Sequence, residues 1–334
     1  MAKRNISEVT DRRLATLVTL LAENATIVIS GARIARELEV SRTTVWRWVT
    51  RLRELGVKVK GQPATGYFLE SVADILTPEL LRKRLKGSLF GKRVWHFFRT
   101  DSTNRVAFDL GHAGEPEGAV VVAEEQTAGR GRAGRAWHSE RGTGIYVTLL
   151  LRPRLAPVQA PLLTMMAGIS AQTAVAAVTG LTVDLKWPND LLIGGKKVGG
   201  ILTEMHAEPT LVKFVIVGIG LNVNQETFPG ELGAMATSLR AETGKMHSRM
   251  EVLARLLREF ENDYNRLLRE GSAGVVRRFE EVSSYARGKK VCVVTGAETF
   301  SGITAGLTPE GLLRVERGNG EIVTVIAGDV TEAR

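Results

Sequence analysis

The strongest constraint on this 334-residue chain is the stretch Gly-Arg-Gly-Arg-Ala-Gly-Arg-Ala-Trp-His-Ser at residues 129–139. Its glycines permit close backbone approach to a ligand, and each intervening arginine can bind a phosphate or carboxylate through two parallel hydrogen bonds. A dinucleotide-binding G-x-G-x-x-G fingerprint would require a helix next, whereas the turn at 141–144 leads into the strand-like run 145–151. The stretch therefore predicts an anion-binding loop, with a solvated basic loop as the alternative.

The length predicts two or three domains. The single cysteine, Cys292, excludes an internal disulfide framework and a multi-cysteine zinc site. A formal net charge of +9 favours phosphate-bearing or polyanionic partners. No apolar run approaches the roughly 18 residues of a membrane span, and the polar start lacks a signal-peptide core, so we expect a cytoplasmic protein without membrane contact.

The first 70 residues carry the signals of a winged helix-turn-helix. Apolar residues recur at helical spacing over 11–23, and Ser30 and Ser41 are placed to cap two further short helices joined by a tight turn. Strand-like runs at 57–60 and 67–69 flank the turn 61–66 and predict a hairpin. This segment holds 12 Lys and Arg against 7 Asp and Glu, a net +5. The alternative is a small helical dimerisation module with a solvated basic face.

The helix that begins after Ser41 turns its apolar residues to one side and leaves a basic, hydroxyl-bearing face outward. This face would enter the major groove, while lysines of the hairpin would lie on phosphates. The residues predicted to contact DNA are Arg42, Thr43, Thr44, Arg47, Lys58 and Lys60. Because one winged helix reads few base pairs, we expect a homodimer on an inverted repeat.

The remaining chain predicts a connecting segment at 71–91 with a short helix, a larger domain at 92–286 and a small domain at 287–334. Strands are expected at 94–98, 118–123, 145–151, 183–185 and 214–217, and helices at 161–178, 250–268 and 273–285. Four short strands at roughly ten-residue spacing near the C-terminus are typical of a small β-barrel. The expected fold is therefore an α/β multidomain chain.

A second motif, Lys186-Trp187-Pro188-Asn189-Asp190, follows the strand at 183–185. A lysine at the end of a buried strand is costly unless it meets an anion. Two other stretches are ambiguous. The small polar side chains at 101–104 either cap the next helix or touch a polar ligand. The glycines at 218–224, where the strand at 214–217 is expected to open, indicate either a glycine bulge or close backbone approach to a ligand.

These motifs together resemble the bifunctional biotin-protein ligases that are also biotin operon repressors. The loop at 129–137 and the motif at 186–190 match the family's most specific patterns in the family's order, and residues 101–104, Gln126, 197–202 and 218–224 match as well. The resemblance covers all three parts of the chain. It implies a DNA-binding domain at 1–70, a linker at 71–91, an α+β ligase domain with a mixed sheet at 92–286 and an SH3-like barrel at 287–334.

The resemblance also implies the chemistry. Biotin and ATP, with Mg²⁺, would give biotinyl-5'-adenylate, and a lysine of a biotin carboxyl carrier protein would then take the biotinyl group. Lys186 and Arg132 would be catalytic. The implied biotin contacts are Ser102, Thr103, Asn104, Gln126, Gly129, Arg130, Gly131, Arg132, Lys186, Gly199 and Gly218. The implied adenylate contacts are Arg132, Arg135, Trp137, Lys186, Asn189 and Asn222. No metal ligand is assigned, and no adenine contact is assigned near 228–239.

Two alternatives belong to other functional classes. A lipoate-type ligase would share the fold and the adenylation chemistry, but the arginine-glycine loop and the winged helix argue against it. A ligand-sensing repressor with an inactive ligase domain is disfavoured because Lys186, Arg132 and Arg135 are all present. The operator sequence, the identity of the carrier and the dimer affinity do not follow from the sequence.

Overall fold

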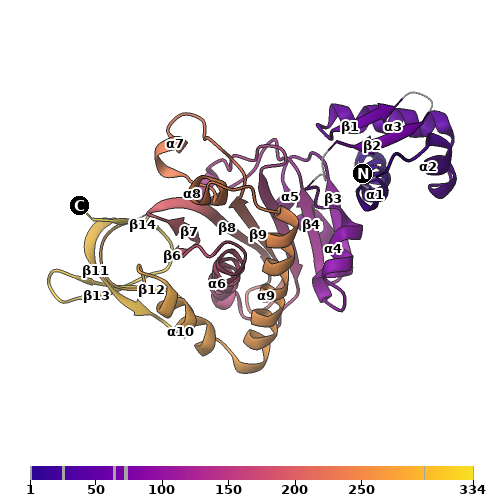
Figure 1. Cartoon of the computed structure of the whole chain (residues 1–334). Helices are drawn as coiled ribbons and strands as arrows, with labels where there is room; N and C mark the ends of the chain where they lie inside the picture. Colours follow the sequence, from indigo (N-terminus) through magenta and orange to yellow (C-terminus); the bar gives the residue numbers. More distant parts are fainter. Residues whose placement is uncertain (1, 25–26, 63–64, 71–73, 297, 334) are drawn as a thin grey trace.

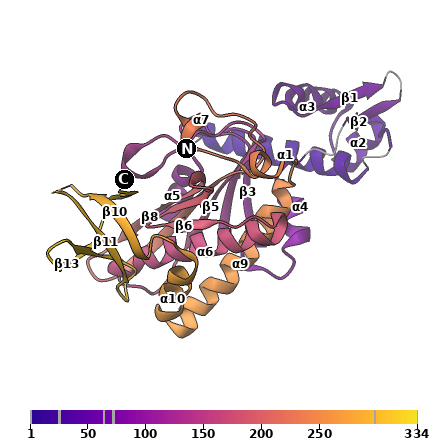
Figure 2. The ribbon, with the colours of Figure 1, turned by 60° about the vertical axis from the view of Figure 1, so that its left-hand side comes forward.

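A computed structural model describes residues 2–24, 27–62, 65–70, 74–296 and 298–333, with side chains from Asp11 onward. Three parts follow one another along the chain, and the N-terminal and C-terminal parts lie at opposite ends of a central sheet domain (Figures 1 and 2). The predicted organisation into a helix-turn-helix part, a mixed-sheet part and a C-terminal antiparallel sheet is confirmed.

The N-terminal part contains α1 (Ala2–Glu23), α2 (Gly31–Glu37) and α3 (Arg42–Glu54), followed by the hairpin of β1 (Val59–Gln62) and β2 (Gly66–Leu69). Both predicted caps form: the hydroxyls of Ser30 and Ser41 each accept a backbone N–H three residues later, at 3.1 Å. The first strand begins at Val59, two residues later than expected. Val57 does not belong to the strand because its backbone N–H donates to the carbonyl of Leu52 and closes the C-terminus of α3.

A mixed seven-stranded sheet forms the centre, in the order β3-β4-β5-β9-β8-β7-β6. Only the β3–β4 pair is parallel among the described ladders of this sheet. The strands are β3 (Arg93–Phe97), β4 (Ala119–Ala123), β5 (Gly144–Leu151), β6 (Asp184–Lys186), β7 (Asp190–Ile193), β8 (Lys196–Ala207) and β9 (Val212–Asn222).

Helices cover both faces of this sheet (Figure 1). On one face lies α5 (Thr103–His112), which packs on β4, β5 and β9. The other face is covered by α6 (Ala160–Thr179) and by α9 (Arg249–Glu270), which packs against α6 and is followed by α10 (Ala273–Val282). The remaining helices are α4 (Pro78–Arg84), α7 (Leu232–Met235) and α8 (Leu239–Thr243), with short 3-10 turns at Leu89–Gly91, Arg132–Gly134 and Pro157–Gln159.

Contrary to the expectation from the sequence, the segment Pro157–Thr179 is long and apolar enough to cross a membrane by length and composition alone. Small and hydroxyl-bearing residues interrupt the apolar run of this segment, but its mean hydropathy stays high. In the protein, α6 lies between the sheet and α9, and most of the segment is buried there. It is thus a core helix of the central domain.

The prediction that the strand ends at residue 217 and opens into a loop at residue 218 is wrong. Strand β9 runs on through Asn222 in an unshifted ladder with β5, so there is no glycine bulge at this place either. The glycines serve close packing. A Cβ on Gly218 would lie 2.0 Å from Oδ1 of Asn104, and one on Gly220 would lie 2.5 Å from the Trp137 ring. Larger residues would therefore displace two side chains of the predicted ligand site.

The C-terminal part is a curved antiparallel sheet of five strands in the order β13-β12-β11-β10-β14. They are β10 (Arg287–Val294), β11 (Thr299–Leu307), β12 (Leu313–Arg317), β13 (Ile322–Val325) and β14 (Asp329–Glu332); the last was not expected from the sequence. In the described residues no ladder joins β13 to β14, so closure into an SH3-like barrel is not confirmed. The Trp187 indole N–H donates to the carbonyl of Gly311 at 3.0 Å and ties this sheet to the central domain.

The segment after the hairpin contributes to both cores. Ile75 belongs to the apolar cluster of the N-terminal part, whereas Leu76, Leu81 and Phe90 are buried in the central cluster. The connection is therefore packed where it is described. The boundaries at 70, 91 and 286 stay predictions.

Candidate active site

A cavity of about 570 Å³ opens where the ends of β5, β7, β8 and β9 meet the arginine-glycine loop and β14. Both sequence motifs reach it. The lining includes every predicted biotin or adenylate contact except Gly129 and Gly199. A Cβ on Gly129 would meet the carbonyl of Trp137, and one on Gly199 would meet the side chain of Leu221. Those two glycines therefore allow close packing in the loop and in the sheet beside the cavity, and their contact with biotin stays a prediction.

One end of the cavity is a set of fixed donors and acceptors around the start of α5. The side-chain oxygen of Gln126 accepts from the backbone N–H of Thr103 at 2.8 Å and from its hydroxyl at 3.1 Å. The Asn104 amide accepts from the buried Thr148 hydroxyl at 2.7 Å and donates to Glu204 at 2.8 Å. These bonds hold the side chains in single orientations, as recognition of a polar ring requires.

Ser102 occupies the N-cap position of α5, but its side chain makes no capping bond. Ser102 is only 3% exposed and lines the cavity. The capping role considered for this hydroxyl is therefore wrong, and its contact with biotin stays a prediction.

Cationic side chains converge on the other end. Arg132 donates to Oδ1 of Asn189 at 3.1 Å, and Arg135 donates to Asp329 of β14 at 2.7 Å. The ammonium of Lys186 lies 5.9 Å from the centre of the Tyr285 ring. Burial lowers the pKa of Lys186, and Asp190 only partly offsets this effect. Burial likewise lowers the pKa of Arg132, with partial compensation from Asp329. An anion bound here would reverse both shifts.

Trp137 lies flat on the glycines of the sheet. Its ring fills the space beside Gly220, and the ammonium of Lys197 lies 5.5 Å from the ring centre. The indole Nε1 is buried and has no hydrogen-bond partner within the part of the chain that the structure describes. An unpaired buried donor costs about 1–3 kcal/mol, so this packing of the ring is held at some cost in stability.

The sequence missed several side chains that complete the site. Glu204 accepts two hydrogen bonds of 3.0 Å from Arg130, so this predicted biotin contact is held by an exposed ion pair. Tyr285 and Asp329 come from distant segments and carried no local signal. Both polar atoms of the Asn189 side chain, a predicted adenylate contact, already have partners. Its oxygen accepts from Arg132, and its amide nitrogen donates to the carbonyl of Ile201 at 3.0 Å.

Comparison with known proteins agrees with this geometry. Residues 97–222 match the Biotin/lipoate A/B protein ligase family, residues 13–68 match an HTH domain and residues 288–331 match the Biotin protein ligase C terminal domain. The Bifunctional ligase/repressor BirA of Bacillus spizizenii is 38% identical over 318 residues, covering 94% of this chain and 97% of that relative. The chain belongs to the bifunctional biotin-protein ligase and repressor family.

A second repressor and a solved ligase structure are also similar to this chain. BirA of Escherichia coli is 28% identical over 94% of this chain and 95% of its own length. Among solved structures, the biotin protein ligase from Aquifex aeolicus in complex with biotin and ATP is 31% identical, with a TM-score of 0.63. That similarity covers 73% of this chain and 99% of the Aquifex chain.

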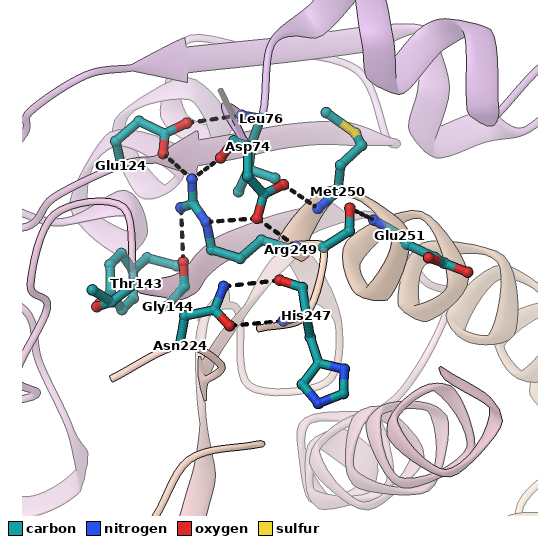
Figure 3. A network of polar contacts seen from close by, with 12 residues as sticks. Asp74, Leu76, Glu124, Thr143, Gly144, Asn224, His247, Arg249, Met250 and Glu251 are labelled. Carbon is teal, nitrogen blue, oxygen red and sulfur yellow. Dashed lines mark hydrogen bonds and ion pairs between the residues drawn. The ribbon is translucent and has the colours of Figure 1, made fainter. Parts of the chain in front are cut away.

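A buried ion network lies behind the site of this family member (Figure 3). The Arg249 side chain is 2% exposed; it donates to Glu124 at 2.7 Å and to the carbonyl of Gly144 at 3.1 Å. Asp74 accepts from the backbone N–H groups of Arg249 at 2.7 Å and Met250 at 3.1 Å, so it caps α9. Glu124 precedes Gln126 by two residues, and Asp74 precedes the central domain. The network thus ties the end of β4 to the interdomain connection.

The HTH part presents the predicted DNA face. Arg42, Thr43 and Arg47 are exposed on α3, and Thr44 is half-buried. On the hairpin, Lys58 is exposed, whereas the ammonium of Lys60 pairs with Glu70 at 2.6 Å. The latter pair is exposed on both sides, so it contributes little stability and leaves Lys60 able to exchange partners.

Proposed function

We propose that this chain activates biotin with ATP and transfers the biotinyl group to a lysine of a biotin carboxyl carrier protein. The proposal rests chiefly on one observation: half-buried Lys186 and Arg132 share a single cavity with the ordered polar set around Gln126. A carboxylate and a triphosphate are both anions, so their meeting requires fixed cations. The polar end of the cavity suits the ureido ring of biotin, which has both donors and acceptors.

In the first step, a biotin carboxylate oxygen attacks the α-phosphorus of ATP, the bond from that phosphorus to the bridging oxygen breaks, and pyrophosphate leaves. Lys186 would contact both the carboxylate and the α-phosphate, and Arg132 would neutralise charge that gathers on the phosphate. Preorganised cations of this kind lower the barrier because they need no reorientation during the reaction. Trp137, whose ring lines the cavity, would cover the adenylate.

Mg²⁺ would enter with ATP. In the described residues no cluster of three or more His, Cys, Asp or Glu side chains is placed to hold a metal ion. Magnesium commonly binds through substrate phosphates and water with only one or two carboxylates, which Asp190 and Asp329 of the cavity could supply. When bound, the ion would neutralise the phosphate charge.

In the second step, the uncharged amine of a carrier lysine attacks the carbonyl of the mixed anhydride. The C–O bond to phosphate breaks, AMP leaves with its electron pair, and the attacking nitrogen loses a proton to solvent. No protein nucleophile takes part, so the chain needs only to position the adenylate and shield it from water.

We further propose that the same chain is a biotin-responsive repressor in the cytoplasm. The exposed arginines of α3 support DNA binding. A homodimer on an inverted repeat would give the HTH part enough base contacts to select an operator.

Biotin-dependent exchange of labelled pyrophosphate into ATP tests the adenylation step. We expect exchange that requires biotin and Mg²⁺ and is much weaker with lipoate in its place. Absence of exchange with biotin would leave the alternative of a repressor with an inactive ligase domain, and preference for lipoate would favour the lipoate-type alternative.

A further inference from the structure

Trp46 is an exposed aromatic residue on the helix predicted to enter DNA. Trp46 is 59% exposed, whereas its apolar neighbours on α3 are buried: Val45 is 1% exposed, Trp48 7% and Val49 0%. The core of the N-terminal part therefore does not need the Trp46 ring. An exposed indole leaves a large apolar surface in water, which association with an apolar partner group would remove.

The surroundings of Trp46 indicate the kind of partner. It lies one helical turn after Arg42 and Thr43 and directly before Arg47, and all three are exposed. Neither arginine has an ion-pair partner within the described part of the chain, so two uncompensated cations lie within about one helical turn of Trp46. This combination of free positive charge and one apolar group fits a polyanion that carries an apolar feature.

The major groove of DNA has such a feature. Phosphates line its edges, and the C5-methyl group of thymine is the apolar group that its floor presents to a protein. Side chains near the start of an inserted helix reach base edges, and Trp46 occupies the fifth position of α3. At this position of an inserted helix, a flat apolar ring can cover a methyl group while the neighbouring arginines reach phosphates or guanine.

We propose that Trp46 is a base-reading residue, whose indole contacts the C5-methyl group of a thymine in each operator half-site. This inference rests on the proposed repressor function. It assigns to the HTH part an apolar specificity contact in addition to the charged and hydroxyl contacts of Arg42, Thr43 and Arg47. A second copy of the chain is the competing occupant of this surface, but the unpaired arginines around the ring would repel a like-charged copy.

The test begins with selection of duplexes from a random pool by the full-length protein with biotin and ATP. Each selected thymine is then replaced by deoxyuridine, which removes only the methyl group. We expect one thymine in each half-site at which this replacement weakens binding by the wild-type protein about fourfold, the effect of one buried methyl group. Trp46→Ala should bind the thymine and uracil duplexes equally, and Trp46→Phe should restore part of the difference.

Biotin-dependent pyrophosphate exchange by Trp46→Ala should equal that of the wild type, which shows that its central domain is folded, and an unchanged circular-dichroism spectrum shows that its helices are intact. An unchanged selected sequence with unchanged sensitivity to deoxyuridine in Trp46→Ala would overturn the inference while leaving the repressor function intact. Selection of no sequence by the wild-type protein would contradict both. Loss of dimerisation by Trp46→Ala in the absence of DNA would assign the ring to contact between copies instead.

Discussion

Arg132 donates a hydrogen bond of 3.1 Å to the side-chain oxygen of Asn189, although the two residues lie 57 positions apart. One belongs to the arginine-glycine loop and the other to the motif that carries Lys186. Asn189 is itself fixed by the bond from its amide to the carbonyl of Ile201 on β8. The loop is therefore joined to the sheet at the point where the proposed reaction takes place.

Removal of the Lys186 ammonium should impair adenylation. We expect Lys186→Ala to lower the rate of adenylate formation by a factor of about 10² or more, roughly 2.7 kcal/mol, which is typical for one preorganised electrostatic group. Single-turnover release of pyrophosphate measures this step. Lys196→Ala, at an exposed position of the same domain, is the matched control and should keep the wild-type rate. Near-normal adenylation by Lys186→Ala would remove this lysine from the mechanism.

The arginine-glycine loop should become ordered when ligands bind. Its three like charges repel one another, and the ion pairs of Arg130 with Glu204 and Arg135 with Asp329 are exposed and therefore weak. Trypsin should cut after Arg130, Arg132 or Arg135 in the ligand-free protein, and biotin with ATP should protect these bonds. Equal cleavage with and without ligands, measured by mass spectrometry of the fragments, would show that the loop does not close on the adenylate.

The Glu124–Arg249 ion pair should make the free energy of unfolding depend on pH in the acidic range. Burial alone would raise the pKa of Glu124, but Arg249 and His96 outweigh it and hold the pKa at about 2. Because the folded-state pKa lies below the ordinary value of 4.5, the stabilisation is present above pH 4.5 and is lost as the pH falls toward 2. Breaking a buried pair costs about 3–5 kcal/mol.

Thermal unfolding of Glu124→Gln from pH 7 down to pH 2 measures this effect. The variant should have a lower midpoint at pH 7 and a flatter pH dependence below 4.5 than the wild type. Glu270→Gln, an exposed carboxylate at the end of α9, is the control and should follow the wild-type curve. A Glu124→Gln midpoint equal to that of the wild type at pH 7 would mean that the pair contributes no net stability.

Two substitutions should separate base reading from phosphate contact. Arg47→Ala should relax the base preference, whereas Lys60→Ala should weaken binding to all sequences alike and reduce the slope of log affinity against log salt by about one unit. Mobility shifts on selected and random duplexes at several salt concentrations distinguish the two results. A sequence-dependent loss in Lys60→Ala would place this lysine at a base edge and contradict its assignment to phosphate.

The sequence was sufficient to predict the parts whose signals are local. Ser30 and Ser41 predicted two helix starts, and the two motifs predicted that Lys186 and Arg132 belong to one site, where both line the same cavity. Prediction failed where the reason for a residue lies far away in the chain. Gly220 suggested a loop because nothing near it in sequence shows that the Trp137 ring occupies its Cβ position.

Contacts between distant segments were equally hidden from the sequence. Arg249 appears as one more arginine on an amphipathic helix, since its partner Glu124 lies 125 residues earlier. Asp329 reaches the cavity because the C-terminal sheet packs on the central domain, through a shared apolar cluster and the bond between Trp187 and Gly311. Such side chains could be found only after the fold had placed them.

We expect the cavity to perform both half-reactions of biotin ligation. Transfer of radiolabelled biotin to a purified biotin carboxyl carrier domain tests it most directly, with ATP and Mg²⁺ present or withheld. We predict label on the carrier that requires ATP, is lost when the acceptor lysine of the carrier is replaced by arginine, and is strongly reduced in Lys186→Ala. A folded wild-type protein that forms no labelled adenylate and leaves the carrier unlabelled in the presence of ATP would contradict the account.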